Sequence, residues 1–359
     1  MTFMIAAAGT GGHVFPGLAV GEALLHLGVP RDEIIYVGGD RLEAEVYPAE
    51  GFRFHPVELT GLKRSLTLAN LRIPGVVMRA KRSIMEIIDR SGARVLLGMG
   101  GYVTIPAGLA ARSRKVPFFN AEQNASAGLA NRVAARWARH SFVSFPETKG
   151  LGRGNWVGNP LREPFWSFDR AALRPEAIGR YELDDAHSVL GVFGGSLGAG
   201  ALNEAVAGMV EAWANGPLSL VHLTGPDHVE GMSSRPCPPG VDWRRVGFED
   251  RMDLFYAAAD LVIARAGGAV AELTATATPS ILVPGSFGSG GHQVENARFL
   301  ERSGASRVLD EASLGDLGSV VTATLAEPAR LEAMSACASA ISRPRAALTI
   351  GEAMIEAAR

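Results

Sequence analysis

The sequence is poor in cysteine, in net charge and in long apolar runs. Its 359 residues include two cysteines, Cys237 and Cys337, which are far apart and lack the spacing of a metal site or a disulfide framework. A formal net charge of −2 argues against a nucleic-acid binder. No uncharged apolar run approaches the roughly 20 residues that span a bilayer, and the N-terminus lacks the basic start of a signal peptide. We therefore expect a reducing, cytoplasmic compartment.

What the chain does contain is a repeated alternation of apolar runs and helical segments. Its hydrophobic content of 47% is enough to exclude a disordered chain, and its 359 residues suit two domains. The alternation proceeds to residue 143 and restarts at residue 189. This pattern is typical of βαβ units. It predicts an α/β fold with two Rossmann-like, doubly wound domains that face a central cleft.

The expected elements follow from the apolar runs and their flanking turn formers. Strands are expected at residues 3–8, 34–37, 95–97, 117–119, 141–143, 189–193, 218–223, 261–264, 280–283 and 306–309. Helices are expected at residues 16–27, 129–137 and 346–358. Turn formers at residues 154–160 predict the linker, so the domains span residues 1–160 and 161–342. The C-terminal helix, within residues 343–359, could pack on either domain.

Three glycine-rich loops each follow an expected strand. We call residues 9–13 the first, residues 98–102 the second and residues 194–199 the third glycine loop. Glycine lets backbone N–H groups approach an anion, and the following helix N-terminus adds positive potential. Phosphate or sugar binding is therefore favoured over tight strand–helix packing without a ligand. None of the loops reads as Gly-x-Gly-x-x-Gly or as a Walker loop, which disfavours a dehydrogenase or kinase site.

The first glycine loop continues as GTGGHVFPGLA over residues 9–19, and this segment closely resembles the opening of the MurG family of peptidoglycan GlcNAc transferases. Further matches fall in the family's order at residues 98–103, 122–124, 158–162, 194–196, 292–293 and 296. The resemblance covers nearly the whole chain. It implies the GT-B architecture and the transfer of GlcNAc from UDP-GlcNAc to undecaprenyl-pyrophosphoryl-MurNAc-pentapeptide, which converts lipid I to lipid II in peptidoglycan synthesis.

The resemblance also implies which residues bind the donor. They are Thr10, Gly11, Gly12, Asn124, Arg162, Ser196, Glu249, Gly267, Gly268, Ala269, Glu272 and Gln293. The first three match positions that meet the sugar and diphosphate end. Asn124 and Gln293 match sugar contacts, whereas Arg162 and Ser196 match diphosphate contacts. Residues 267–272 match the stretch that holds uridine, with Glu272 on the ribose.

The residue types suit these roles, although each has a structural alternative. Glu272 can accept from two ribose hydroxyls or complement the dipole in the first turn of a helix. Arg162 offers a planar fork to phosphate oxygens or is an exposed linker arginine. Asn124 and Gln293 can each donate and accept, as sugar hydroxyls require, or cap a loop.

His13 is the candidate catalytic base. An inverting transfer needs a base for the attacking 4-hydroxyl of MurNAc, and the pKa of histidine suits this at neutral pH. The resemblance supports that role; the alternatives are that His13 binds loop carbonyls or orients the acceptor. The sequence has no Asp-x-Asp motif and no cluster of His or Asp ligands. We therefore expect no tightly bound metal or other cofactor, and stabilisation of the UDP leaving group by helix N-termini, loop N–H groups and Arg162.

The segment between Glu58 and Glu86 contains no other acid. It carries basic and apolar side chains in alternation: Leu62, Lys63, Arg64, Leu66, Leu68, Leu71, Arg72, Ile73, Val76, Val77, Met78, Arg79, Lys81 and Arg82. Such a segment suits an anionic membrane surface and equally an ordinary amphipathic helix. The lipid-linked acceptor favours the membrane, which places the protein peripherally on the cytoplasmic face of the plasma membrane. Other cell-wall synthesis proteins are candidate partners.

Four departures from the family affect the predicted donor site. Leu197 stands where the family usually has Gln, Ala121 stands where many members carry His, the segment from Arg265 to Glu272 is one residue shorter than usual, and the loop of residues 285–291 is unusually rich in glycine. Three other functions stay open from the sequence. They are another GT-B glycolipid or natural-product glycosyltransferase, a sugar-nucleotide epimerase, and a non-catalytic UDP-sugar-binding scaffold.

Overall fold

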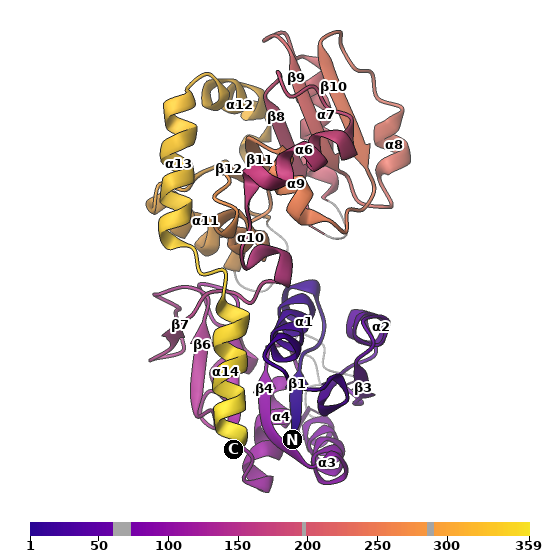
Figure 1. The fold of residues 1–359 in the computed structure, drawn as a ribbon, viewed down its shortest axis with the longest axis vertical. Helices are drawn as coiled ribbons and strands as arrows, with labels where there is room; N and C mark the ends of the chain where they lie inside the picture. The colour runs from indigo at the N-terminus through magenta and orange to yellow at the C-terminus, as the bar shows by residue number, and fades with distance from the viewer. Residues whose placement is uncertain (60–72, 196–198, 286–290) are drawn as a thin grey trace. The chain divides into compact units, whose positions relative to one another are not determined.

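The computed structural model describes residues 1–59, 73–195, 199–285 and 291–359. These residues form two compact units, one of Met1–Glu163 with Pro344–Arg359 and the other of Pro164–Arg343 (Figure 1). Each unit is built on one parallel sheet flanked by helices. The predicted α/β class with two doubly wound sheets is thus confirmed. The predicted residues Ser196 and Leu197, and the basic–apolar segment up to Arg72, lie outside the described residues.

The first unit contains a seven-stranded sheet of order β3-β2-β1-β4-β5-β6-β7. Its strands are β1 (Thr2–Ala6), β2 (Ile34–Gly38), β3 (Arg53–Pro56), β4 (Ala93–Gly98), β5 (Phe118–Glu122), β6 (His140–Val143) and β7 (Asn155–Trp156). Its helices are α1 (Gly11–His26), α2 (Leu42–Ala49), α3 (Ile73–Ser91), α4 (Thr104–Arg114), α5 (Leu129–Ala134) and α14 (Ala346–Ala358). The strand order reverses between β1 and β4, which is the switch point where open α/β sheets bind ligands.

The second unit contains a six-stranded sheet of order β10-β9-β8-β11-β12-β13. Its strands are β8 (Val189–Phe193), β9 (Leu218–Leu223), β10 (Val241–Val246), β11 (Leu261–Ala264), β12 (Ser280–Leu282) and β13 (Ser306–Val308). Its helices are α6 (Arg170–Tyr181), α7 (Gly200–Glu211), α8 (Val229–Ser233), α9 (Met252–Ala258), α10 (Ala269–Ala275), α11 (His292–Arg302), α12 (Leu317–Leu325) and α13 (Pro328–Ile341). Here the order reverses between β8 and β11.

Two expectations about local structure were wrong. Residues 154–160 are not simply a linker, because Asn155–Trp156 pair with β6 as the edge strand β7. Helix α1 begins at Gly11 rather than at Pro16, so Gly11, Gly12 and His13 form its first turn. The strands β3, β7 and β10 were not expected, and each lies at an edge of its sheet.

The C-terminal helix α14 packs in the first unit, where it contacts α1 and β4. Its Ile350 and Met354 are buried in the same hydrophobic cluster as Leu24 of α1. The approach is close at Gly351, because a Cβ there would lie 3.0 Å from Cδ1 of Leu27. The first unit is therefore assembled from both ends of the chain.

Two glycines of α1, Gly17 and Gly21, leave room for the side chains of two buried tyrosines. The Tyr47 hydroxyl donates to the Val14 carbonyl at 3.1 Å, and the Tyr36 hydroxyl donates to the Gly17 carbonyl at 3.2 Å. A Cβ on Gly17 would lie 2.8 Å from the Tyr47 hydroxyl, and one on Gly21 would lie 1.9 Å from the Tyr36 hydroxyl. The two rings stack with centroids 3.8 Å apart. The small residues of α1 therefore set how closely β2 and α2 approach it.

In the second unit, Arg170 of α6 forms hydrogen bonds at the C-terminal ends of α9 and α10. Its guanidinium donates to the Tyr256 and Ala259 carbonyls, each at 2.6 Å, and to the Thr278 hydroxyl at 2.6 Å. Burial lowers the pKa of Arg170 to about 10. Since helix C-termini leave carbonyls without intrahelical partners, this arginine satisfies groups that would otherwise be buried unpaired.

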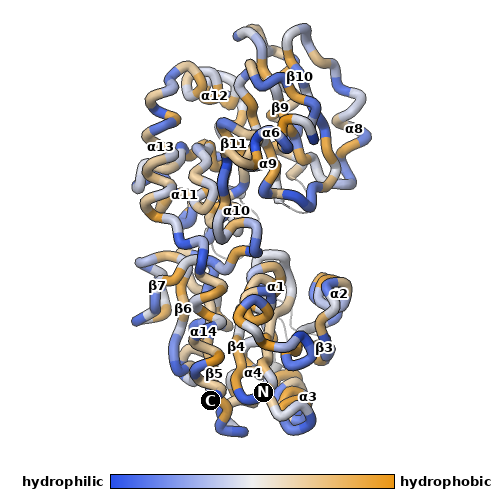
Figure 2. The backbone as a smooth tube through the Cα atoms, viewed as in Figure 1, coloured by the Kyte–Doolittle hydropathy of each residue, from blue (hydrophilic) through white to orange (hydrophobic). Residues whose placement is uncertain are grey.

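Helix α3 is amphipathic, and Figure 2 shows both hydrophobic and hydrophilic residues along its length. Its buried stripe consists of Val76, Ala80, Ile84, Ile87 and Ile88. Met78, Arg79 and Arg82 are exposed. Part of the predicted membrane segment is therefore an ordinary buried helix face. Within the described residues, no helix is both long and apolar enough to cross a bilayer.

Candidate functional site

The first and second glycine loops lie in direct contact at the switch point of the first sheet. The Met99 amide donates to the Ala6 carbonyl at 2.8 Å. Gly101 has a φ of +75°, and a Cβ on it would lie 2.4 Å from the Ala8 carbonyl oxygen. Only glycine accommodates both that φ and that approach. The strand ends thus bring together two loops that are separated by about 90 residues of sequence.

His13 lies against the second glycine loop. A Cβ on Gly100 would lie 2.6 Å from Cδ2 and 2.8 Å from Nε2 of His13. Gly100 has a φ of +100°, and its amide donates to the Thr104 hydroxyl at 2.9 Å. The imidazole is half-buried, and the exposed Thr10 is the N-cap residue of α1, without a side-chain cap bond. The structure therefore brings the predicted residues Thr10, Gly11, Gly12 and His13 together at one loop edge.

A buried glutamate anchors the start of the first glycine loop. Glu43 of α2 is 1% exposed, and its carboxylate accepts from the Gly9 amide at 3.1 Å and from the Gly39 amide at 2.9 Å. The Gly9 amide, which precedes the predicted residues Thr10, Gly11 and Gly12 in the first glycine loop, is thus bound by a carboxylate of the protein itself. The sequence contains no local signal for this contact, because Gly9 and Glu43 are 34 residues apart.

The predicted sugar contact Asn124 is held by a second buried glutamate. Glu122 accepts from the Asn124 backbone and side-chain amides at 3.0 and 3.1 Å, from the Gly128 amide at 3.0 Å and from the Asn131 side chain at 2.8 Å. Glu122 is 2% exposed. It organises the loop after β5 and was not among the predicted site residues, although it belongs to a segment that resembles the family. Its neighbour Ala121, one of the predicted departures from the family, packs in the core.

Arg162 lies in a salt bridge within the first unit. Its guanidinium is 2.6 Å from a carboxylate oxygen of Glu22 and 3.2 Å from one of Glu50. Its Nε and Nη2 groups are therefore engaged with carboxylates, while 41% of its side chain is exposed. A diphosphate contact at Nε or Nη2 would require Arg162 to exchange these carboxylates for phosphate oxygens.

In the second unit, the predicted uridine stretch follows β11 at the switch point. Gly267 and Gly268 precede α10, and Glu272 lies in its first turn. The Tyr256 hydroxyl donates to Glu272 at 2.8 Å, and burial raises the pKa of the Glu272 carboxyl. Glu272 thus occupies the dipole-complementing position expected of the structural alternative. A ribose contact at its remaining acceptor positions is compatible with this geometry.

Helix α11 connects this stretch to the loop after β12. The predicted sugar contact Gln293 accepts from the Gly285 amide at 2.8 Å, and Asn296 donates to the Ala266 carbonyl at 3.0 Å. The structure therefore gathers Gly267, Gly268, Ala269, Glu272 and Gln293 around the carboxyl ends of β11 and β12.

Glu249 is fully engaged within the protein. It accepts from Arg180 at 2.7 and 3.1 Å, from the Tyr181 hydroxyl at 2.6 Å and from the Arg251 amide at 2.8 Å. Burial opposes ionisation of Glu249, but the hydrogen bonds from Arg180, Tyr181 and Arg251 outweigh it and lower its pKa to about 2. Its side chain joins the loop after β10 to α6, so the predicted donor contact would require one of these bonds to break.

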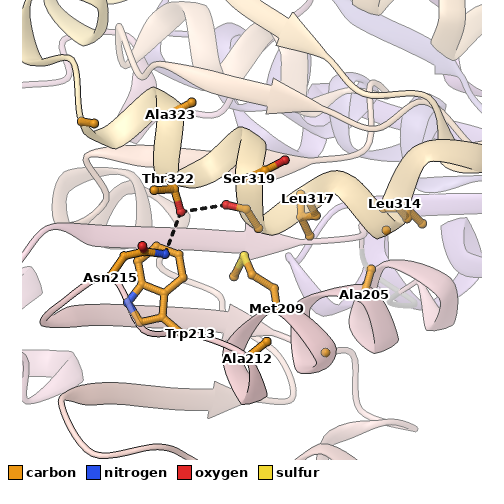
Figure 3. A pocket seen from close by; sticks show the side chains of 14 residues that line it. Ala205, Met209, Ala212, Trp213, Asn215, Leu314, Leu317, Ser319, Thr322 and Ala323 are labelled. Carbon is orange, nitrogen blue, oxygen red and sulfur yellow. Dashed lines mark hydrogen bonds between the residues drawn. The ribbon is translucent and has the colours of Figure 1, made fainter.

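A hollow in the second unit lies apart from the predicted residues, between α7 and α12 (Figure 3). Its volume is about 750 Å³, and its lining contains no charged side chain. Trp213 and Met209 form part of the wall, and Asn215 donates to the Thr322 hydroxyl at 3.1 Å. Because it offers no cation and no predicted site residue, this hollow is not the candidate donor site. The described residues also contain no group of three or more His, Cys, Asp or Glu side chains arranged to hold a metal ion.

Comparisons with known proteins agree with this architecture. Residues 3–143 match the glycosyltransferase family 28 N-terminal domain, and residues 189–350 match the corresponding C-terminal domain. The solved structure of Acinetobacter baumannii MurG superimposes with a TM-score of 0.81 at 27% identity, and the match covers 99% of each chain.

Two curated relatives define the family more narrowly. A protein from Mycobacterium sp. (strain JLS) is 39% identical over 363 residues, which cover 100% of this chain and 96% of that protein. Another from Acidithiobacillus ferrooxidans (strain ATCC 53993 / BNL-5-31) is 38% identical over 360 residues, which cover 99% and 97%. Both are named UDP-N-acetylglucosamine--N-acetylmuramyl-(pentapeptide) pyrophosphoryl-undecaprenol N-acetylglucosamine transferase. The chain therefore belongs to glycosyltransferase family 28 and, within it, to the MurG family of N-acetylglucosamine transferases.

Proposed function

We propose that this protein transfers GlcNAc from UDP-GlcNAc to the 4-hydroxyl of MurNAc in undecaprenyl-pyrophosphoryl-MurNAc-pentapeptide. The hydroxyl oxygen attacks the anomeric carbon, the bond from that carbon to UDP breaks, and the configuration inverts. Family membership supports the substrates. The observation that carries the chemistry is the position of His13, a half-buried imidazole held against Gly100 where the first and second glycine loops meet.

We assign to His13 the removal of the proton from the attacking hydroxyl. A side chain with a pKa near the operating pH is the most effective general base. His13 occupies the first turn of α1 with Gly11 and Gly12, whose N–H groups have no intrahelical acceptor. The same helix start therefore offers a base together with backbone donors for an oxygen of either substrate.

We assign donor binding to the second unit. The glycines at the start of α10 allow close approach of a nucleoside, and Glu272 accepts from the ribose hydroxyls. Gln293 contacts the GlcNAc, and Ser196 in the third glycine loop contacts the diphosphate. Asn124 of the first unit contributes a sugar contact, and Arg162 contributes a diphosphate contact, either from Nη1 or by exchanging Glu22 and Glu50 for phosphate oxygens. The negative charge that develops on UDP is stabilised by loop amides and helix N-termini.

We further propose that the protein acts at the cytoplasmic face of the plasma membrane. The exposed Met78, Arg79 and Arg82 of α3 combine apolar surface with positive charge, as an anionic bilayer surface requires. Co-sedimentation with vesicles should increase with anionic lipid content and decrease with salt. Binding that ignores both would exclude the electrostatic form of this proposal.

Release of UDP measured with UDP-GlcNAc and a short-chain lipid-linked MurNAc-pentapeptide tests the reaction. We expect release that depends on the acceptor, and we expect His13→Ala to lower turnover by a factor of about 100 or more. Epimerisation of UDP-GlcNAc without acceptor would instead indicate an epimerase. Donor binding without turnover in the presence of the acceptor would indicate a scaffold, and loss of acceptor affinity with intact turnover in His13→Ala would exclude the base assignment.

A further inference from the structure

Helix α2 holds the chain on both sides of His13. Glu43 accepts a hydrogen bond from the amide of Gly9, four residues before His13, at 3.1 Å. Tyr47 donates to the carbonyl of Val14, the residue after His13, at 3.1 Å. Glu43 and Tyr47 are four residues apart and therefore lie on one face of α2. Both are buried, with 1% and 0% of their surface exposed.

We propose that Glu43 and Tyr47 are positioning residues that fix the imidazole of His13 against Gly100 in the orientation needed for proton removal. This inference rests on the proposed function. Neither side chain is assigned a substrate contact, because Glu43 binds the first glycine loop and Tyr47 binds the backbone of α1. Their effect on the reaction passes through the backbone that carries His13.

The hydrogen bond to Glu43 is what holds Gly9 in place. Gly9 has a φ of +106°, and no atom lies within 4 Å of a Cβ built on it. No neighbour therefore packs against the side-chain position of this residue, and glycine is the most conformationally free residue type. The carboxylate also accepts from the Gly39 amide at 2.9 Å, so it joins the ends of two neighbouring strands, β1 and β2.

The double contact requires a carboxylate. Glutamine has one acceptor oxygen, and its NH₂ group would face a backbone N–H. Glu43→Gln can therefore satisfy only one of the two glycine amides while keeping the shape of the side chain. Tyr47→Phe removes the bond to Val14 but keeps the ring that stacks on Tyr36.

The chain offers a matched control in Tyr36. Its buried hydroxyl also donates to a carbonyl of α1, but at Gly17, about one helical turn beyond His13. Tyr36→Phe thus removes the same chemical bond from the same helix without touching the residues that flank His13. A purely structural role for these contacts predicts equal losses in Tyr36→Phe and Tyr47→Phe.

The test is steady-state turnover with UDP-GlcNAc and the short-chain lipid-linked acceptor. Because a misplacement of about 1 Å can cost about 100-fold, we expect Glu43→Gln and Tyr47→Phe to lower kcat by about 10- to 100-fold. We expect kcat to fall by a larger factor than either KM rises, because misplacing the base weakens binding of the transition state more than binding of the substrates. Tyr36→Phe should keep kcat within about twofold of the unmodified enzyme.

A second readout does not need turnover. The His13 signal in protein labelled with ¹³C-histidine, assigned by its loss in His13→Ala, should shift in Glu43→Gln and Tyr47→Phe and stay in place in Tyr36→Phe. Unchanged kcat and an unchanged signal in the first two variants would overturn the inference, as would equal loss in all three. If the unmodified protein shows no turnover, the proposed function fails, while the His13 signal still decides whether α2 positions the imidazole.

Discussion

The packing of Tyr36 on α1 predicts the effect of adding one methyl group at Gly21. A Cβ there would lie 1.9 Å from the Tyr36 hydroxyl oxygen and 3.0 Å from Cζ. The ring cannot move aside easily, because Tyr36 is 0% exposed and stacks on Tyr47. Overpacking costs about 1–3 kcal/mol and a lost hydrogen bond about 1 kcal/mol, whereas alanine recovers about 1 kcal/mol of helix propensity. Gly21→Ala should therefore destabilise the first unit by roughly 1–3 kcal/mol.

A double-mutant cycle separates this clash from other effects. Tyr36→Phe alone should cost about 1 kcal/mol. The double variant removes the oxygen that the new methyl meets, so its loss should fall short of the sum of the single losses by about 1 kcal/mol or more. Urea unfolding followed by circular dichroism measures all three values.

Gly75→Ala in α3 is the control within the same unit. The nearest atom to a Cβ on Gly75 is Nη1 of Arg79, at 3.8 Å, which is ordinary contact. This variant should be neutral or gain up to about 1 kcal/mol. Additive losses in the cycle, or a stable Gly21→Ala protein, would refute the packing argument.

Three further predictions concern stability and metal dependence. Burial lowers the pKa of His222 to about 3, so below pH 6.5 the unfolded chain binds a proton that the folded chain does not. The free energy of unfolding of the unmodified protein, relative to that of His222→Phe, should then decrease by about 1.4 kcal/mol for each unit that the pH falls between 6 and 4. A constant difference between the melting curves of the two proteins over this range would contradict this prediction. Arg170→Met leaves helix-end carbonyls of the second unit unpaired and should cost about 3 kcal/mol or more in urea unfolding; a loss below about 1 kcal/mol would show that water replaces the guanidinium. Dialysis against a chelator should leave turnover unchanged, whereas activity restored only by added metal would contradict the metal-free leaving-group account.

The central strands were predictable because they are buried on both faces. The structure places β8, β9 and β11 at the residues expected from their apolar runs. Of the four edge strands, only β13 was expected, and β3, β7 and β10 were not. Strand β10 reads VDWRRV and β3 reads RFHP, and neither shows a continuous apolar run because one side of an edge strand needs no apolar cover.

The site was predictable only as far as its motifs extend along the chain. The resemblance selected His13, Glu272 and Gln293 as candidates, and the roles predicted for them depend on their own side chains. It could not show that Arg162 is paired with Glu22 or that Glu43 anchors Gly9, because those contacts join residues far apart in sequence. The Pro16 signal for a helix start was also misleading, since α1 includes Pro16 and begins at Gly11.

The position of α14 has a consequence for how the chain folds during synthesis. The second unit is one continuous segment, Pro164–Arg343, whereas the first unit needs residues from both ends of the chain. The ribosome therefore completes the second unit while the apolar surface of α1 that receives Ile350 and Met354 is still uncovered. Synthesis of residues 344–359, rather than of the first 163 residues, is the event that completes the unit carrying His13.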